Sequence, residues 1–166
     1  MSRPPSAPLP ILGWCEWVAL PGLGLPAVRA KVDTGAATSA IHAHAVERFA
    51  RRGAPWARFE VHPFFRRRRQ VTVACEAPVV DVCRLVRSSS GHVEERLVVR
   101  VVLRLGVRVG APEFEADLTL ADRWKMQFPM LVGREALAGR ALVDPAATFR
   151  LGRLARPGDY YDLSRA

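Results

Sequence analysis

The chain has 166 residues, of which 49% are hydrophobic and 25% are charged, and its formal net charge is +9 at pH 7. This length and composition predict one soluble globular domain with a sizeable core, and they exclude an intrinsically disordered chain. Arginine supplies almost all of the positive charge, a bias that a GC-rich coding sequence also produces, so we do not take the charge as a sign of nucleic-acid binding.

The N-terminus and the cysteines bear on cellular location. Residues 1–10 hold four prolines and no long apolar run, so we expect a disordered leader that is neither a signal peptide nor a membrane span. Cys15, Cys75 and Cys83 are an odd number without close spacing, which favours reduced thiols over a disulfide framework. Together these features predict a cytoplasmic protein with no membrane partner.

An acidic turn follows the first predicted hairpin. The elements expected here are a strand over residues 12–20, a turn over 21–24 and a second strand over 25–32. Asp33, Thr34, Gly35 and Ala36 come directly after the second strand. Glycine admits backbone angles that other residues avoid, so this order predicts a tight turn that presents one carboxylate at a strand end.

The central part of the chain predicts one short helix and a series of strands. Apolar residues at positions 43, 46, 49 and 50 have helical spacing, so we expect a helix over residues 43–52. Later β-type patterns recur with little helix between them, which favours an all-β fold, either an antiparallel closed barrel or a sandwich. The strands expected in this part are residues 59–62, 70–74, 79–86, 96–105 and 114–120.

The C-terminal part predicts a second short helix and two terminal strands. The helix is expected over residues 135–138 and is ended by Gly139, and the strands are expected over 141–143 and 148–151. We therefore expect one domain over residues 11–155 and a polar tail over residues 156–166.

Two segments carry a family resemblance. Asp33-Thr34-Gly35-Ala36 and the later Leu131-Val132-Gly133-Arg134, in this order, resemble the retropepsin-like aspartic peptidases. More narrowly, the chain is similar to a bacterial group labelled "ATP-dependent zinc protease" or RimK-associated, whose members are found beside ATP-grasp ligases. The segments that carry this narrower resemblance are Lys31–Ala36, Arg87–Gly91, Leu120–Arg123, Met130–Glu135 and Val143–Pro145.

The resemblance implies a closed-barrel aspartic endopeptidase that acts on a peptide or protein substrate without a cofactor or metal. Asp33 would be the catalytic acid and base. Two carboxylates sharing one proton are needed to activate water, and one chain supplies one such acid, so a homodimer would complete the dyad across its two-fold axis. Terminal strands would make the dimer interface, as is common in this fold.

The resemblance also assigns supporting roles around Asp33. Thr34 would hold the two acidic turns together, Gly35 would leave room for substrate and Ala36 would keep the pocket floor small. In the second segment, Leu131 and Val132 would form an apolar layer beneath the acids, Gly133 would permit a close crossing, and Arg134 would need a carboxylate or carbonyl partner that the sequence leaves open.

A polar tip over residues 87–95 lies between two predicted strands and is typical of a hairpin. In the resembling family, a hairpin at this place in the order is the flap that closes over substrate. A serine-rich tip suits a mobile lid, because it holds few apolar anchors. We expect the flap tip at Ser89, Ser90, Gly91 and His92.

Three other functions remain open. A zinc peptidase would use His42 and His44, which share one face of a strand, with Cys75 or Cys83; no HExxH motif is present, and such histidines are more often surface or packing residues. A nucleic-acid binder would use the four arginines 66–69 after Phe64-Phe65, but a solvated loop is the commoner reading. A non-catalytic module would hold a peptide tail made by an ATP-grasp ligase.

Overall fold

The computed structural model describes residues 8–65, 70–87 and 92–161. Strands dominate these ranges, and the helical elements there are one four-residue α-helix and two 3₁₀ turns, Pro21–Leu23 and Pro157–Tyr160. None of the helices in the described ranges has the length and apolar character that a bilayer crossing requires. The remaining elements are β1 (Ile11–Gly13), β2 (Cys15–Leu20), β3 (Leu25–Asp33), β4 (Ser39–Arg51), β5 (Ala54–Val61), β6 (Val73–Arg87), β7 (His92–Arg104), β8 (Glu113–Ala121), β9 (Met130–Gly133), α1 (Arg134–Leu137) and β10 (Leu142–Asp144).

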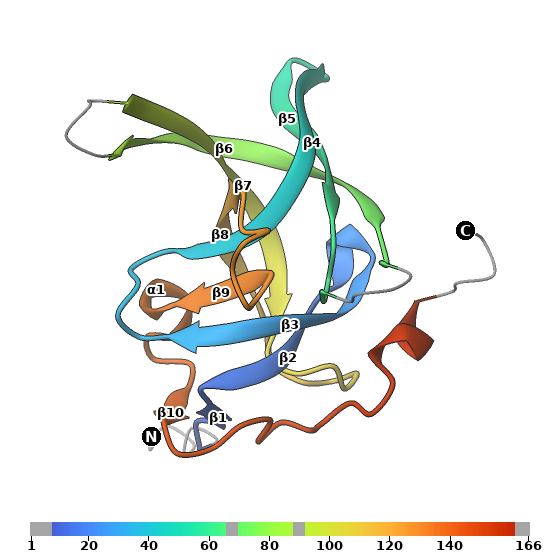
Figure 1. The fold of residues 1–166 in the computed structure, drawn as a ribbon, viewed down its shortest axis with the longest axis vertical. Helices are drawn as coiled ribbons and strands as arrows, with labels where there is room; N and C mark the ends of the chain where they lie inside the picture. Colours follow the sequence, from blue (N-terminus) through green and yellow to red (C-terminus); the bar gives the residue numbers. More distant parts are fainter. Residues whose placement is uncertain (1–7, 66–69, 88–91, 162–166) are drawn as a thin grey trace, which may run out of the picture.

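Eight of these strands form one sheet that closes on itself. Its order is β2-β3-β9-β4-β5-β6-β7-β8, and additional pairings join β2 to β7 and β4 to β8. The circuit β3-β9-β4-β8-β7-β2 therefore returns to its starting strand, as the closed-barrel prediction requires. The β4–β5 and β6–β7 hairpins extend beyond this circuit, while β1 and β10 pair in parallel at the opposite end (Figure 1). The all-β prediction is confirmed.

Apolar residues recur along the strands, and their buried side chains form one core. In β3, for example, Leu25, Ala27, Val28, Ala30 and Val32 are buried. Large side chains from other strands complete the core, and full burial of each stabilises the fold by about 1.5–3 kcal/mol. The largest fully buried apolar side chains are Phe59, Leu12, Leu20, Leu25, Ile41, Leu103, Leu105, Leu118 and Met130.

The helix predicted over residues 43–52 is wrong, because this segment belongs to β4. It pairs antiparallel with β5, and Phe49 lies opposite Trp56. The register shifts between His44 and Glu47, where Ala45 has φ +49°. This bulge breaks the strand's two-residue alternation and so leaves apolar residues at positions that mimic helical spacing. Pairing with the following strand then decided the structure, which the spacing within the segment does not reveal.

The strand predicted over residues 148–151 is also wrong, whereas the one predicted over 141–143 is present as β10. Residues 148–151 make a turn, with Phe149 at φ +53°. The amides of Arg150 and Leu151 donate to the Glu16 carboxylate at 2.8 and 3.3 Å, and the Gly13 amide donates to it at 2.6 Å. The Phe149 amide donates to the carbonyl of Cys15 at 2.8 Å, so a buried carboxylate and one strand carbonyl satisfy this backbone in place of a regular strand pairing.

The predicted strand over residues 79–86 and the last two residues of the one predicted over 70–74 lie in the single strand β6, whereas residues 70–72 precede it and are not in a strand. In the expected C-terminal tail, the side chain of Tyr161 is buried against Phe64. Its hydroxyl donates to the carbonyl of Ala27. This contact ties the chain after residue 156 to β3.

The buried acid yields a stability prediction. Glu16 is 0% exposed and collects three backbone amides, so Glu16→Ala leaves those donors without an acceptor. We expect a loss of about 3 kcal/mol or more in the free energy of unfolding, because each unsatisfied buried donor costs about 1–3 kcal/mol. Urea unfolding measures it. The exposed Glu47 is the control: Glu47→Ala should change stability by less than about 0.5 kcal/mol, and an equal loss in both variants would contradict the role of Glu16.

Candidate active site at the Asp33 turn

Asp33 ends β3 at the place where β9 ends beside it. The two strands are parallel, with Val32 opposite Val132 and Asp33 opposite Gly133. Because parallel strands end at the same edge of a sheet, the acidic turn and the second matched segment meet there, although about a hundred residues separate them in the sequence. The structure thus brings the two predicted segments together.

The Asp33 carboxylate is held by nitrogen donors. Oδ1 accepts the amides of Gly35 at 3.1 Å and Ala36 at 3.2 Å, and Oδ2 lies 3.2 Å from Nζ of Lys31. Burial acts to raise the pKa of Asp33, but the Lys31 ammonium and the two amides together outweigh it, so this pKa lies below its ordinary value. In a single chain, Asp33 is therefore an ionised carboxylate whose side chain is one-quarter exposed.

Gly133 allows the chain to cross closely behind the acidic turn. A Cβ at this position would lie 2.5 Å from the carbonyl oxygen of Thr38 and 2.8 Å from that of Ala37, closer than real Cβ contacts. The Gly133 amide donates to Ser39 Oγ at 3.0 Å. The close crossing that we expected at Gly133 is present, and no other residue type fits without moving the backbone.

Arg134 finds its partner in the acidic turn itself. Its Nη1 donates to the carbonyl of Gly35 at 3.1 Å, and its amide donates to the carbonyl of Ala36 at 2.8 Å. The next amide, of Glu135, donates to the carbonyl of Ala37 at 3.1 Å. The start of α1 therefore holds three consecutive carbonyls of the turn, which answers the question that the sequence left open.

The other matched residues divide into buried and exposed sets. Val132 is fully buried and Leu131 is half-buried, as an apolar layer behind the acid requires. Thr34 and Gly35 are exposed at the tip of the turn, and Ala36 is half-buried. Within the described part of the chain, the hydrogen-bond and ion-pair partners of the Asp33 carboxylate are all nitrogens, so one chain presents one carboxylate here.

Arg123 ends one of the segments that carry the family resemblance, but the sequence did not assign it a role beside Asp33. It is half-buried, and Nε donates to the carbonyl of Phe128 at 3.3 Å. Burial and the charge of Arg96 lower the pKa of Arg123, while the charge of Asp33 acts to raise it. Lys31, Arg123 and Arg134 thus make the surroundings of the acid positively charged. Its electrostatic link to Asp33 arises from the fold, so the local pattern did not predict that link.

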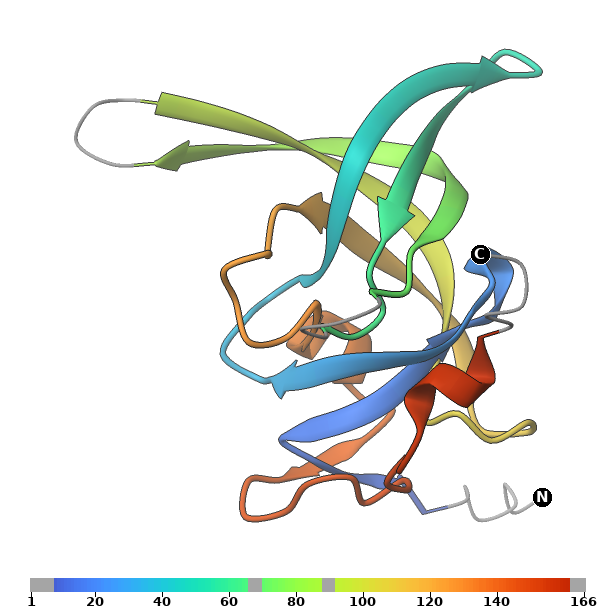
Figure 2. The same cartoon turned by 45° about the vertical axis from the view of Figure 1, so that its right-hand side comes forward.

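The predicted flap lies at the end of the β6–β7 hairpin. Ser89, Ser90 and Gly91 fall outside the described residues, while His92 begins β7 and pairs with Arg87. The hairpin projects on the side of the molecule where β3 and β9 end (Figures 1 and 2). The position of the hairpin in the fold therefore agrees with the flap prediction, and the role of its tip stays a prediction.

A second group of polar side chains lies between β4 and the chain that follows β5. His42 and His44 converge as the strand spacing predicted, and His62 joins them. Cys75 is not a member of this group in the described chain: its Sγ donates to the carbonyl of Leu23, and burial raises its pKa to about 12. The sequence missed His62, because only the β4–β5 pairing brings it to the other two.

The four arginines 66–69 lie outside the described residues. Of the aromatic pair before them, Phe64 is 3% exposed and packs against Trp17, so it is not available to stack on a base. Phe65 packs against His42 and Trp124. Phe64 and Phe65 therefore act in packing.

Comparisons with known proteins agree with the geometry of the turn. Residues 11–153 match the model of the RimB-like family, described as "Retropepsin-like aspartic endopeptidase RimB". A solved structure of a protein of unknown function from Legionella pneumophila is similar with a TM-score of 0.69 and 26% identity, covering 86% of this chain and 98% of that one.

Curated relatives carry a different name. The chain is 44% identical over 143 residues to a probable alpha-L-glutamate ligase of Shewanella halifaxensis, covering 86% of this chain and 30% of that protein. It is 47% identical over 144 residues to a protein of the same name from Parasynechococcus marenigrum, covering 87% of this chain and 30% of that protein. The chain therefore spans under a third of the length of these relatives.

The ion pair at the turn predicts the titration of Asp33. Replacing Lys31 by Met removes the ammonium that favours the ionised carboxylate, so the pKa of Asp33 should rise. NMR titration of the Asp33 carboxyl carbon measures it. Since the pKa is lowered in the folded chain, the stability from the pair is present above the unfolded pKa and is lost as the pH falls through the folded one. Lys125→Met, at the only other lysine, is the control, and an unchanged Asp33 midpoint in Lys31→Met would refute the assignment.

The crossing at Gly133 predicts a second effect. Gly133→Ala should lower the free energy of unfolding by about 1–3 kcal/mol, the usual cost of overpacking, because the backbone of residues 37–38 must move. Gly22→Ala is a matched control, since nothing lies within 4 Å of the added methyl group. Denaturant unfolding of both variants tests this, and equal stability would show that the crossing is not tight.

Proposed function

The chain belongs to the RimB-like family of retropepsin-like aspartic endopeptidases, and from this premise we propose that it hydrolyses peptide bonds with a dyad formed by Asp33 of two identical chains. The observation that carries the proposal is the Asp33 turn: one ionised carboxylate, fixed by two amides and presented at the surface. Such a turn is half of an aspartic-peptidase centre, because the reaction needs a second carboxylate to hold the shared proton.

The chemistry follows from bringing two such turns together. Two carboxylates about 3 Å apart do not both ionise, so one keeps a proton and the pKa values of the pair separate. The ionised Asp33 takes a proton from water, whose oxygen attacks the substrate carbonyl, and the protonated Asp33 donates to the carbonyl oxygen. The Asp33 that took a proton from water then donates that proton to the leaving nitrogen as the C–N bond breaks. Both titrations belong to the pair.

The surroundings of Asp33 favour a particular electrostatic balance. Lys31 and the amides lower the pKa of one carboxyl in the single chain, whereas a second carboxylate raises the cost of ionising both. The turn also leaves Thr34 and Gly35 exposed, where a second copy would meet them across a two-fold axis. Dimerisation is thus part of the proposed active site.

The proposed substrate is an acidic peptide. Lys31, Arg123 and Arg134 lie around the acid, and the whole chain carries a formal charge of +9, so a negatively charged peptide is attracted to this face. The relatives named as probable alpha-L-glutamate ligases suggest its chemistry, because that name makes glutamate a substrate of those relatives. A glutamyl tail on a protein fits both observations.

The relatives' names favour one alternative. A domain similar to this chain makes up about 30% of proteins named as ligases, so it could hold an acidic tail for an ATP-grasp ligase without cutting it. In that case the Asp33 turn binds and does not react. The two functions differ in what happens when Asp33 loses its charge.

A mixing experiment with Asp33→Asn tests the dyad. Cleavage of a peptide with an oligoglutamate tail should be lost in the variant, since the amide cannot act as a general base. When equal amounts of wild type and variant re-associate at random, only about a quarter of dimers keep both acids. Activity should therefore fall to about a quarter of that of wild type at the same total chain concentration. A fall to about half of that reference would mean that each chain acts alone and would refute the shared dyad. Tail binding without cleavage by the wild type would support the alternative.

A further inference from the structure

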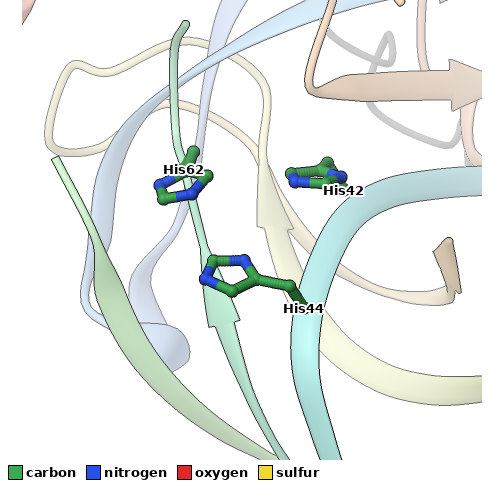
Figure 3. A group of neighbouring side chains, drawn as sticks. All are labelled: His42, His44 and His62. Atoms are coloured by element: carbon green, nitrogen blue, oxygen red, sulfur yellow. The ribbon is translucent and has the colours of Figure 1, made fainter. Parts of the chain in front are cut away.

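Three histidine rings converge at one place in the fold. His42 and His44 lie on β4, and His62 follows the end of β5 (Figure 3). One nitrogen from each ring lies within 4.8 Å of the others. The His44 and His62 rings are 4.5 Å apart between centroids, and His42 lies 5.8 Å from each. Three imidazoles in contact are a set of ligands for a transition metal.

The two ring nitrogens of His44 have different surroundings. Its Nε2 lies 2.8 Å from Oε2 of Glu60, so this nitrogen carries the proton and donates it to the carboxylate. Its Nδ1 is buried and has no hydrogen-bond partner in the described chain. Buried polar atoms nearly always have a hydrogen-bond partner. The lone pair on His44 Nδ1 is therefore available to a metal ion.

His62, like His44, has one nitrogen that donates to an oxygen and one that keeps a lone pair. Its Nδ1 lies 3.0 Å from the carbonyl oxygen of Val71, which only accepts hydrogen bonds, so Nδ1 carries the proton. Thr72 Oγ1 lies 3.3 Å from the same nitrogen. The lone pair of His62 is consequently on Nε2. A histidine whose other nitrogen donates to a carboxylate or a backbone carbonyl is the usual form of a metal ligand.

His42 requires a small change before it can bind a metal. Its Nδ1 accepts the Arg123 amide at 2.9 Å, so the neutral ring carries its proton on Nε2. Asp122 Oδ1 lies 3.6 Å from Nδ1. If the proton moves to Nδ1 and is donated to Asp122, Nε2 becomes a ligand and the Arg123 amide must give way. Binding at His42 is thus coupled to the segment that begins at Asp122.

We propose that His42, His44 and His62 bind one divalent transition-metal ion, with Zn²⁺ as the ion that suits them best. Zinc takes imidazole nitrogens at about 2.0–2.1 Å in a tetrahedral arrangement, so nitrogens that lie within 4.8 Å of one another need to approach by up to about 1.5 Å, through rotation of the rings. Three protein ligands leave a fourth position open for water. Hard cations such as Ca²⁺ and Mg²⁺ prefer oxygen ligands and do not fit this set.

The proposed metal would join parts of the fold that lie far apart in sequence. Trp124 packs against His42 and His62 with ring centroids 5.7 and 5.4 Å away. The Arg123 amide contacts His42, while the Arg123 side chain acts electrostatically on Asp33. A metal at the histidines therefore changes the segment beside the acidic turn, because the Arg123 amide loses its acceptor on His42. The proposal does not depend on peptidase activity, since it concerns binding only.

Metal binding by the purified full chain tests the proposal. After treatment with a chelator and dialysis, the chain should take up one Zn²⁺, and Co²⁺ should give the visible absorption of a nitrogen-ligated site. His44→Gln and His62→Gln should each weaken Zn²⁺ binding by about 100-fold or more, and Glu60→Gln by about 10- to 100-fold through its contact with His44. His92→Gln, at the fourth histidine of the sequence, should bind Zn²⁺ as the wild type does.

Nitrogen NMR of the wild-type histidines gives a readout that does not depend on whether the variants fold. Zn²⁺ should shift Nδ1 of His44 and Nε2 of His62, and leave the rings' other nitrogens protonated. Absence of zinc uptake, unchanged affinity in His44→Gln and His62→Gln, or equal weakening in His92→Gln would overturn the proposal. So would zinc uptake that leaves these histidine signals unmoved, because the ion would then lie elsewhere.

Discussion

The close crossing of the chain behind β3 and β9 is the constraint on which the candidate site depends. Gly133 lets the backbone of residues 37–38 pass at a distance that excludes a side chain, and Arg134 then reaches the carbonyl of Gly35. The turn that carries Asp33 is thereby held from both sides. Without this crossing, the two amides that bind the carboxylate would have no fixed position, and a second copy would meet no defined surface.

The same constraint explains the electrostatics of the acid. A carboxylate that accepts two amides and an ammonium is stable as an anion, so a single chain is not built to hold the proton that amide hydrolysis needs. Another carboxylate nearby changes that balance, because like charges resist joint ionisation. Glu16 is an acid with a different role. Its buried carboxylate accepts the backbone amides of Gly13, Arg150 and Leu151 and so holds the C-terminal turn against the end of β1. Glu16 thus serves stability, whereas Asp33 is the acid that we propose for catalysis.

Local sequence patterns predicted what depends on local geometry. The strand before Asp33 and the turn after it follow from residue type and order, whereas the close crossing at Gly133 was implied by the family resemblance; the structure has all three. Pairing and hydrogen bonding between separate segments were not predictable in this way. Residues 43–52 became a strand because β5 lies beside them, and residues 148–151 became a turn because Glu16 accepts their amides.

The parts of the site that come from several segments were missed for the same reason. Arg123 comes to act on Asp33, and His62 comes to lie beside His42 and His44, only after the sheet has closed.

The most direct test of the account is the distance between the Asp33 carboxylates of two chains in an experimentally determined structure of the active protein. We predict a separation of about 3 Å across a two-fold axis. A monomeric active protein, or a dimer in which both acids face solvent far apart, would contradict the account.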